Sequence, residues 1–123
     1  MIKILLIEDH THTRQLLRTL LEMEGYRVLT PSTPEPQSVM SVVQQEHPAI
    51  MILDAHLREF SGFDILAALR PLDPEQRPKI ILTSGEDLGL EADQAGANAF
   101  LLKPFAPQQL LRLIENLNAR DAL

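Results

Sequence analysis

The sequence contains no cysteine, and only three of its 123 residues are lysines: Lys3, Lys79 and Lys103. Without cysteine, neither a disulfide framework nor a thiolate metal site can form. No apolar run approaches the ~20 residues that a membrane-spanning helix needs. The first residues, MIK, do not have the layout of a signal peptide. Together these absences predict a cytoplasmic protein without a membrane segment.

Positive charge is scarce as well, because 11 lysines and arginines face 17 acidic residues, which gives a net charge of −6. Binding to nucleic acid is driven largely by basic side chains on phosphates, so we expect no direct nucleic-acid binding by this domain. The sequence has no internal repeat and no low-complexity tract. Its length suits a single domain over residues 1–123.

Short apolar runs alternate with helical patterns along the chain. Each run is apolar throughout, which is typical of a strand that is covered on both faces of a parallel sheet. The alternation therefore predicts a doubly wound α/β fold with five parallel strands. The strands are expected at 2–7, 26–29, 50–53, 80–82 and 99–102, and the helices within 11–26, 36–47, 62–70, 88–96 and from 107 onward.

Two of the expected helices carry specific signals. In the first, Leu16, Leu17, Leu20 and Leu21 fall on one helical face and are predicted to pack in the core. The fourth helix is expected to be short and weak because Gly89 lies inside it, at a cost of ~1 kcal/mol relative to alanine.

Polar side chains follow four of the five expected strands, at the point where each strand ends. The carboxyl ends of parallel strands share one edge of the sheet, and open α/β sheets bind ligands outside that edge. We therefore expect these side chains to converge. They are Glu8 and Asp9 after the first strand, Asp54 after the third, Thr83 and Ser84 after the fourth, and Lys103 after the fifth.

The expected cluster points to a metal ion and a phosphoryl group. A buried carboxylate is costly unless something pairs with it, and three carboxylates close together repel one another. A hard divalent cation relieves that repulsion, and Mg²⁺ favours one or two carboxylates together with waters and a phosphate. Lys103 adds a further positive charge, and the hydroxyl of Thr83 can hydrogen-bond a phosphoryl oxygen. We therefore expect Asp54 to meet Mg²⁺ and a phosphoryl group.

Four short motifs, in order, resemble those of the receiver domain of two-component response regulators. LLIEDH resembles the acidic pair of that family, MILDAHL its phosphoacceptor strand, ILTSG its Thr-small pair and FLLKPF its Lys-Pro signature. The resemblance covers essentially the whole chain. It implies a flavodoxin-like fold with five helices and strand order 2-1-3-4-5. It also implies a phosphorylation-controlled signalling switch rather than an enzyme that turns over an external substrate.

The resemblance implies a role for the charged residues. Asp54 would accept a phosphoryl group from a histidine kinase or a phosphotransfer protein, with Mg²⁺ as the cofactor. Asp54, Asp9 and the backbone carbonyl of His56 would bind the metal directly, and Glu8 would bind it through water. Lys103 would bind a phosphoryl oxygen and the Asp54 carboxylate.

The resemblance also implies how the signal leaves the site. Thr83, with the small Ser84 beside it, would move toward the phosphoryl group, and the Phe100 ring would turn inward. The peptide bond between Lys103 and Pro104 would be cis, which proline makes less costly. The change would be read on the fourth helix, fifth strand and fifth helix, a surface that would also allow a homodimer.

The sequence departs from the receiver pattern at three places. Arg58 stands four residues after Asp54, where proline is usual, which is expected to loosen that loop and to let the guanidinium approach the phosphoryl group. The stretch 83–96 is two residues shorter than usual, which again predicts a short fourth helix. Ala106 stands where a residue that caps the last helix is expected. None of these departures removes a catalytic group.

Two other functions use related chemistry. A Mg²⁺-dependent phosphatase of the haloacid dehalogenase type also has an aspartate nucleophile at a strand end, but it needs a second aspartate two residues later, where this chain has His56. A flavodoxin-like FMN carrier needs a phosphate loop rich in serine, threonine and glycine, where this chain has EDHTHTR. The signalling switch is therefore the favoured function and the phosphatase the alternative.

Three histidines lie near the expected site. His10 and His12 are spaced for a zinc site, but two nitrogens without a cysteine make a poor one, and we expect both to face solvent. The His56 side chain lies at the rim, where it either affects the lifetime of the phosphoryl group or is a passive loop residue.

Overall fold

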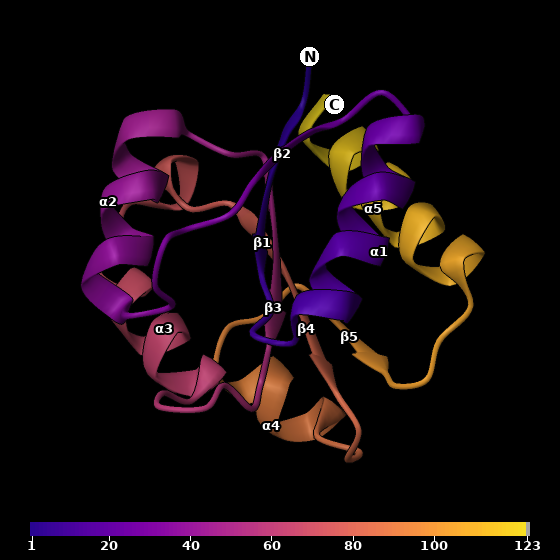
Figure 1. Cartoon of the computed structure of the whole chain (residues 1–123). Helices are drawn as coiled ribbons and strands as arrows, with labels where there is room; N and C mark the ends of the chain where they lie inside the picture. The colour runs from indigo at the N-terminus through magenta and orange to yellow at the C-terminus, as the bar shows by residue number, and fades with distance from the viewer. Residues whose placement is uncertain (123) are drawn as a thin grey trace.

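A five-stranded parallel sheet lies between two layers of helices in the computed structural model, which describes the backbone of residues 1–122 and the side chains of residues 1–119 (Figure 1). The strand order is β2-β1-β3-β4-β5, and every neighbouring pair is parallel. The predicted fold class and strand order are therefore confirmed. The strands are β1 (Lys3–Ile7), β2 (Arg27–Leu29), β3 (Ile50–Asp54), β4 (Lys79–Ser84) and β5 (Ala99–Leu102).

Five α-helices connect and follow the strands, close to the expected positions. A short 3₁₀ helix before β4, Pro74–Gln76, was not predicted. The α-helices are α1 (Thr11–Met23), α2 (Pro36–Glu46), α3 (Gly62–Leu69), α4 (Gly89–Gln94) and α5 (Pro107–Ala122).

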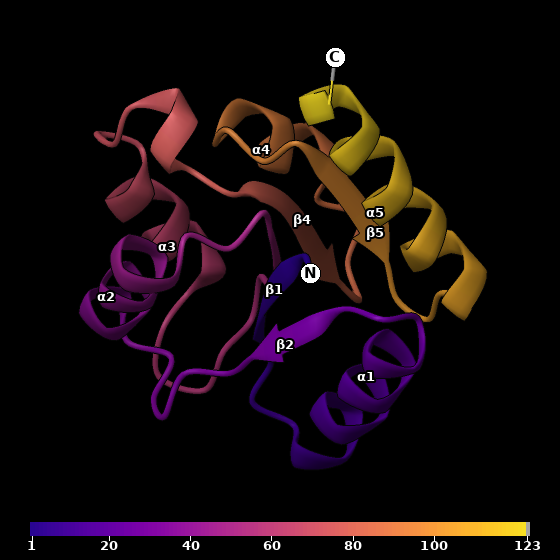
Figure 2. The same ribbon diagram turned by 90° about the horizontal axis from the view of Figure 1, so that it is seen from above.

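Side chains of the central strands alternate between two apolar layers. In β1, Leu5 and Ile7 pack toward α2, α3 and α4, whereas Ile4 and Leu6 pack toward α1 and α5. Figure 2 shows α1 and α5 on one side of the sheet and α2 and α3 on the other. A strand that is covered on both faces has no solvent-facing positions, which explains why these runs are apolar throughout.

The leucines of α1 do not all reach the core. Leu21 is fully buried, whereas Leu16 is 59% exposed, so the prediction that Leu16 packs in the core is wrong. At 100° per residue, the stripe from Leu16 to Leu21 spans about 140° of the helix surface, which is wider than the arc that one sheet covers. Leu17 and Leu21 pack against the sheet, whereas Leu16 lies outside the contact between α1 and the sheet.

Helix α4 is short, as expected. It has six residues, and Ala92 is buried while most of the others face solvent. Among the described residues, no helix has the length and apolar character that a membrane span requires.

The loop after β3 is held close to the end of that strand. The N–H of Gly62 donates to the carbonyl of Ala55 at 2.8 Å. A Cβ atom at Gly62 would lie 2.5 Å from the carbonyl oxygen of Asp54, so only glycine fits this approach. Ser61 then begins α3 with a capping box, because its hydroxyl accepts from Phe63 and its own N–H donates to Asp64.

Candidate functional site

The polar residues that end four strands converge at the carboxyl edge of the sheet. Asp54 is the last residue of β3 and lies in register with Thr83 of β4. Glu8 follows β1, and Lys103 follows β5. Glu8, Asp54 and Thr83 are each no more than 6% exposed, so this edge buries two carboxylates.

The Lys103 ammonium joins the two buried carboxylates. Its Nζ lies 2.9 Å from Oε1 of Glu8 and 2.9 Å from Oδ2 of Asp54, although these residues are distant in sequence. The Lys103 side chain is 27% exposed, so the ammonium remains within reach of a ligand from solvent. The sequence predicted that these three groups meet, and the structure brings them together.

Burial and hydrogen bonding have opposite effects on the pKa of Glu8, and likewise on the pKa of Lys103. Burial is the largest influence on Glu8 and favours its neutral form, but hydrogen bonds from Lys103 and from the His10 N–H outweigh it and hold the pKa of Glu8 below its ordinary value. For Lys103, burial favours the neutral amine, but the hydrogen bonds to Asp54 and Glu8 outweigh it and raise the pKa of the ammonium. Both groups are therefore charged at neutral pH.

The second oxygen of Asp54 faces the next loop. Oδ1 accepts from the N–H of His56 at 3.0 Å. The His56 ring lies 3.3 Å from the carboxylate of Glu86, which joins the loop after β3 to the loop after β4. The role of the His56 carbonyl as a metal ligand stays a prediction.

Residues around Lys103 and β4 complete the rim. The peptide bond between Lys103 and Pro104 is cis. The N–H of Lys103 donates to the carbonyl of Ser84 at 2.8 Å, and the Ser84 hydroxyl accepts from the N–H of Glu86 at 3.0 Å. The fully buried Ser84 thus fixes both the β5 end and the loop toward α4.

Asp9 has one satisfied oxygen and one unsatisfied oxygen. Its Oδ2 accepts from the N–H of Arg58. This contact ties the loop after β3 to Asp9, whereas a looser loop was expected from the arginine at position 58. Its Oδ1 is buried and has no hydrogen-bond partner among the described residues. A buried carboxylate oxygen without a partner is costly unless a cation binds it, so the donor set here fits a divalent metal.

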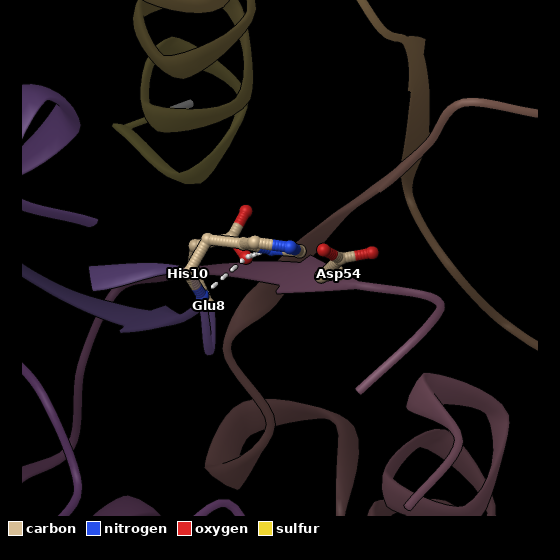
Figure 3. A group of neighbouring side chains, drawn as sticks. All are labelled: Glu8, His10 and Asp54. Carbon is tan, nitrogen blue, oxygen red and sulfur yellow. Dashed lines mark hydrogen bonds and ion pairs between the residues drawn. The ribbon is translucent and has the colours of Figure 1, made fainter. Parts of the chain in front are cut away.

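His10 takes part in this cluster, which sequence reasoning missed. Ligand atoms of Glu8, His10 and Asp54 lie within 4.8 Å of one another (Figure 3). The His10 ring is 70% exposed, as predicted, but its Nδ1 lies 3.3 Å from Oε2 of Glu8. The reason is local: His10 is the extended residue before α1, and its backbone N–H also donates to Glu8. His12, inside α1, is exposed as expected.

The site can be compared with known proteins. The chain matches the family described as response regulator receiver domain over residues 4–115. The chain belongs to this family. Receiver domains of two-component response regulators are signalling domains and not enzymes that turn over an external substrate.

Relatives of this receiver domain differ in length. An uncharacterized 14.6 kDa protein in the sodA1 3' region of Leptolyngbya boryana is 34% identical over 115 residues, which cover 91% of this chain and 86% of the relative. The probable transcriptional regulator ycf27 of Cyanophora paradoxa is 32% identical over 120 residues, which cover 96% of this chain. The chain spans only about half of that relative, at 48% of its length.

The fold agrees with solved receiver domains. The crystal structure of a response regulator receiver domain protein from Clostridium thermocellum has a TM-score of 0.84 and 27% identity, with 99% of this chain and 98% of that chain covered. The sheet order is therefore that of a receiver domain.

Replacing Lys103 with methionine tests the pairing. The change leaves two buried carboxylates without their cation, and the free energy of unfolding at pH 7 should fall by about 2 kcal/mol, less than for a fully buried pair because Lys103 is partly exposed. Without Lys103, burial raises the pKa of Glu8, so the folded variant takes up a proton as the pH falls. Urea titrations should show the deficit shrinking from pH 7 to pH 5.

The matched control is Lys3→Met. Lys3 lies 3.2 Å from Glu46 in a pair whose side chains are 32% and 38% exposed, so its loss should cost below about 1 kcal/mol at either pH. An equal deficit at pH 7 and pH 5 for the Lys103 variant would show that Glu8 does not depend on the ammonium.

Proposed function

We propose that this receiver domain is a phosphorylation-controlled switch of a two-component phosphorelay and that Asp54 is its phosphoacceptor. The observation that carries this proposal is the position of the Asp54 carboxylate. It is 5% exposed, it ends a central strand, and one of its oxygens lies 2.9 Å from the Lys103 ammonium. A nucleophile in that position has positive charge available for a phosphoryl oxygen.

The proposed step is an in-line displacement at phosphorus. A carboxylate oxygen of Asp54 forms a bond to phosphorus while the bond from phosphorus to the histidine nitrogen of the donor breaks, and the electron pair stays on that nitrogen. The Lys103 ammonium binds a phosphoryl oxygen, and the His56 N–H keeps the carboxylate oriented. Water later attacks the acyl phosphate and restores Asp54.

The cofactor of this proposal is Mg²⁺. Asp9, Asp54 and the backbone carbonyl of His56 would hold it directly, and Glu8 would hold it through water. When bound, Mg²⁺ neutralises negative charge on the carboxylates and on the transferred oxygens. The buried oxygen of Asp9 supports this assignment, because a cation gives it the partner that it lacks among the described residues.

The proposal covers residues 1–123 as one receiver domain, with a histidine kinase or phosphotransfer protein as its partner, in the cytoplasm and without direct contact to nucleic acid. The phosphatase alternative needs a second aspartate where His56 stands. Position 56 carries an imidazole and not a carboxylate, which supports a switch over turnover of an outside substrate.

Replacing Asp54 with asparagine should abolish phosphorylation, because an amide is a poor nucleophile. Acetyl phosphate with Mg²⁺ should add one acid- and base-labile phosphoryl group to the wild-type protein, as measured by intact-mass spectrometry. Asp73→Asn, which changes an exposed aspartate before the 3₁₀ helix, should leave labelling intact. Labelling of the Asp54 variant at the wild-type level would refute the assignment.

We further infer that the signal leaves through α4, β5 and α5. The Phe100 ring of β5 lies beneath α4, since a methyl group added at Gly89 would be 3.7 Å from its Cδ2 atom. Thr83 is one strand away and in register with Asp54. A shift of Thr83 toward the phosphoryl group would therefore free space for the Phe100 ring. Movement of that ring would change how α4 packs against β5. The exposed Leu90 and Leu102 would suit a homodimer through this surface.

Amide hydrogen exchange tests this route. Helix α4 has few backbone hydrogen bonds and little buried surface, so residues 87–95 should exchange faster than the other helices. Beryllofluoride with Mg²⁺, which mimics the phosphoryl group, should slow this exchange about tenfold. The Asp54→Asn variant should show no slowing under the same conditions. Equal protection of residues 87–100 with and without beryllofluoride in the wild type would exclude this surface as the output.

An apolar groove beside Lys103 suits the protein that donates the phosphoryl group. The groove has a volume of about 660 Å³ and includes Leu16, Leu20, Lys103 and Phe105 in its walls. Because Lys103 both lines the groove and contacts Asp54, a partner that fills the groove is brought directly to the phosphoacceptor. Leu16 is a large apolar side chain that does not pack in the core and is exposed in this groove, which supports this role.

Replacing Leu16 with serine should slow phosphotransfer from a protein donor about tenfold, because it removes an exposed apolar side chain from the wall of the groove. The measurement is radiolabel transfer from the purified histidine kinase that labels the wild type fastest, compared with labelling by acetyl phosphate, which should not change. Met23→Ser, on the same helix but outside the groove and 79% exposed, is the control. Equal slowing of both donors would place the defect in the site and not in docking.

A further inference from the structure

Asp9 is held at both its backbone and its side chain by two arginines that contribute different groups. The Arg14 guanidinium donates to the backbone carbonyls of Glu8 at 2.9 Å and of Asp9 at 3.4 Å. Arg58 contributes its backbone N–H, which donates to Oδ2 of Asp9 across 49 residues of sequence. The Asp9 carboxylate is thus fixed in orientation before any ligand arrives.

The donor itself is rigidly placed. Position 58 lies in a tight loop in which the N–H of Leu57 donates to the carbonyl of Phe60 at 3.1 Å, and His56 and Ser61 pair across the loop. Gly62 closes the loop against the end of β3. A donor in so short a loop loses little conformational freedom when it binds a carboxylate, so the contact can orient Asp9.

The two carboxylate oxygens of Asp9 have different surroundings. Oδ2 is occupied by the Arg58 N–H, and Oδ1 is buried with no partner among the described residues. If the side chain were free to rotate, the two oxygens would be equivalent and Oδ1 could turn to water. The hydrogen bond to Oδ2 opposes that rotation and keeps Oδ1 buried.

We propose that the backbone N–H of residue 58 is a positioning group that orients Asp9 for the metal. The inference rests on the proposed function, since it assumes that Mg²⁺ binds at this edge. The arginine side chain is not required for it. Every amino acid except proline carries this N–H, so among substitutions at position 58 only proline removes the contact with Asp9.

Two variants at position 58 separate the N–H from the side chain. Arg58→Ala keeps the N–H and removes the guanidinium, whereas Arg58→Pro removes both. In Mg²⁺ titrations followed by amide chemical shifts, the alanine variant should bind within about twofold of wild type. The proline variant should bind about tenfold more weakly, the usual effect of losing a hydrogen bond to a charged group.

A measurement without metal tests the hydrogen bond directly. The amide of residue 58 should exchange about tenfold more slowly in the wild type than in Asp9→Ala, because the carboxylate protects it. This comparison stands even if the proline variant folds poorly.

The outcomes are distinct. The positioning role is wrong if the wild type binds Mg²⁺ and the proline and alanine variants bind Mg²⁺ with equal affinity. It is also wrong if the amide of residue 58 exchanges at the same rate in the wild type and in Asp9→Ala. In either case the proposed function stands. If the wild type does not bind Mg²⁺ at millimolar concentration, the metal site of the proposed function fails and this inference fails with it.

Discussion

The contact of one ammonium with two buried carboxylates is the interaction on which the rest of this receiver domain depends. Lys103 pairs with Glu8 and Asp54 at the edge of an apolar sheet, where buried carboxylates without a cation would destabilise the fold. The same contact joins the ends of β1, β3 and β5. Under the proposed function, a ligand that competes for Lys103 would act on three strands at once, which would link chemistry at this edge to distant surfaces.

Those surfaces lie around the site in a definite arrangement. The groove that contains Leu16 and Lys103 opens on the α1 side, and the Phe100 ring underlies α4 on the other face. Helix α5, which belongs to the proposed output surface, lies on the α1 side as well, so the sheet separates the proposed docking groove only from the α4 part of that surface. The short and largely exposed α4 suits the proposed output, because elements that shift are drawn from the less stable parts of a fold.

Much of this structure could be predicted from the sequence, for identifiable reasons. Strands covered on both faces are apolar throughout, and parallel strands bring their ends to one edge, so Asp54 and Lys103 could be placed together from sequence alone. The exposure of Leu16 could not, because periodicity does not reveal how wide an arc the sheet covers. Nor could the contact of Arg58 with Asp9, because it is made by a backbone N–H, which every residue but proline carries and which therefore leaves no signature in the side chains.

The charges at the edge explain why a cation and a phosphoryl group would depend on each other here. Glu8, Asp9 and Asp54 with Lys103 give a formal charge of −2, which one divalent cation cancels. Under the proposed reaction, Asp54 exchanges its single charge for a phosphoryl group of about −2. The edge would then carry about −3, and Lys103 alone could not balance it. A cation bound before transfer would lower this repulsion, so the proposed metal would both supply the partner that Oδ1 of Asp9 lacks and favour the proposed phosphorylation of Asp54.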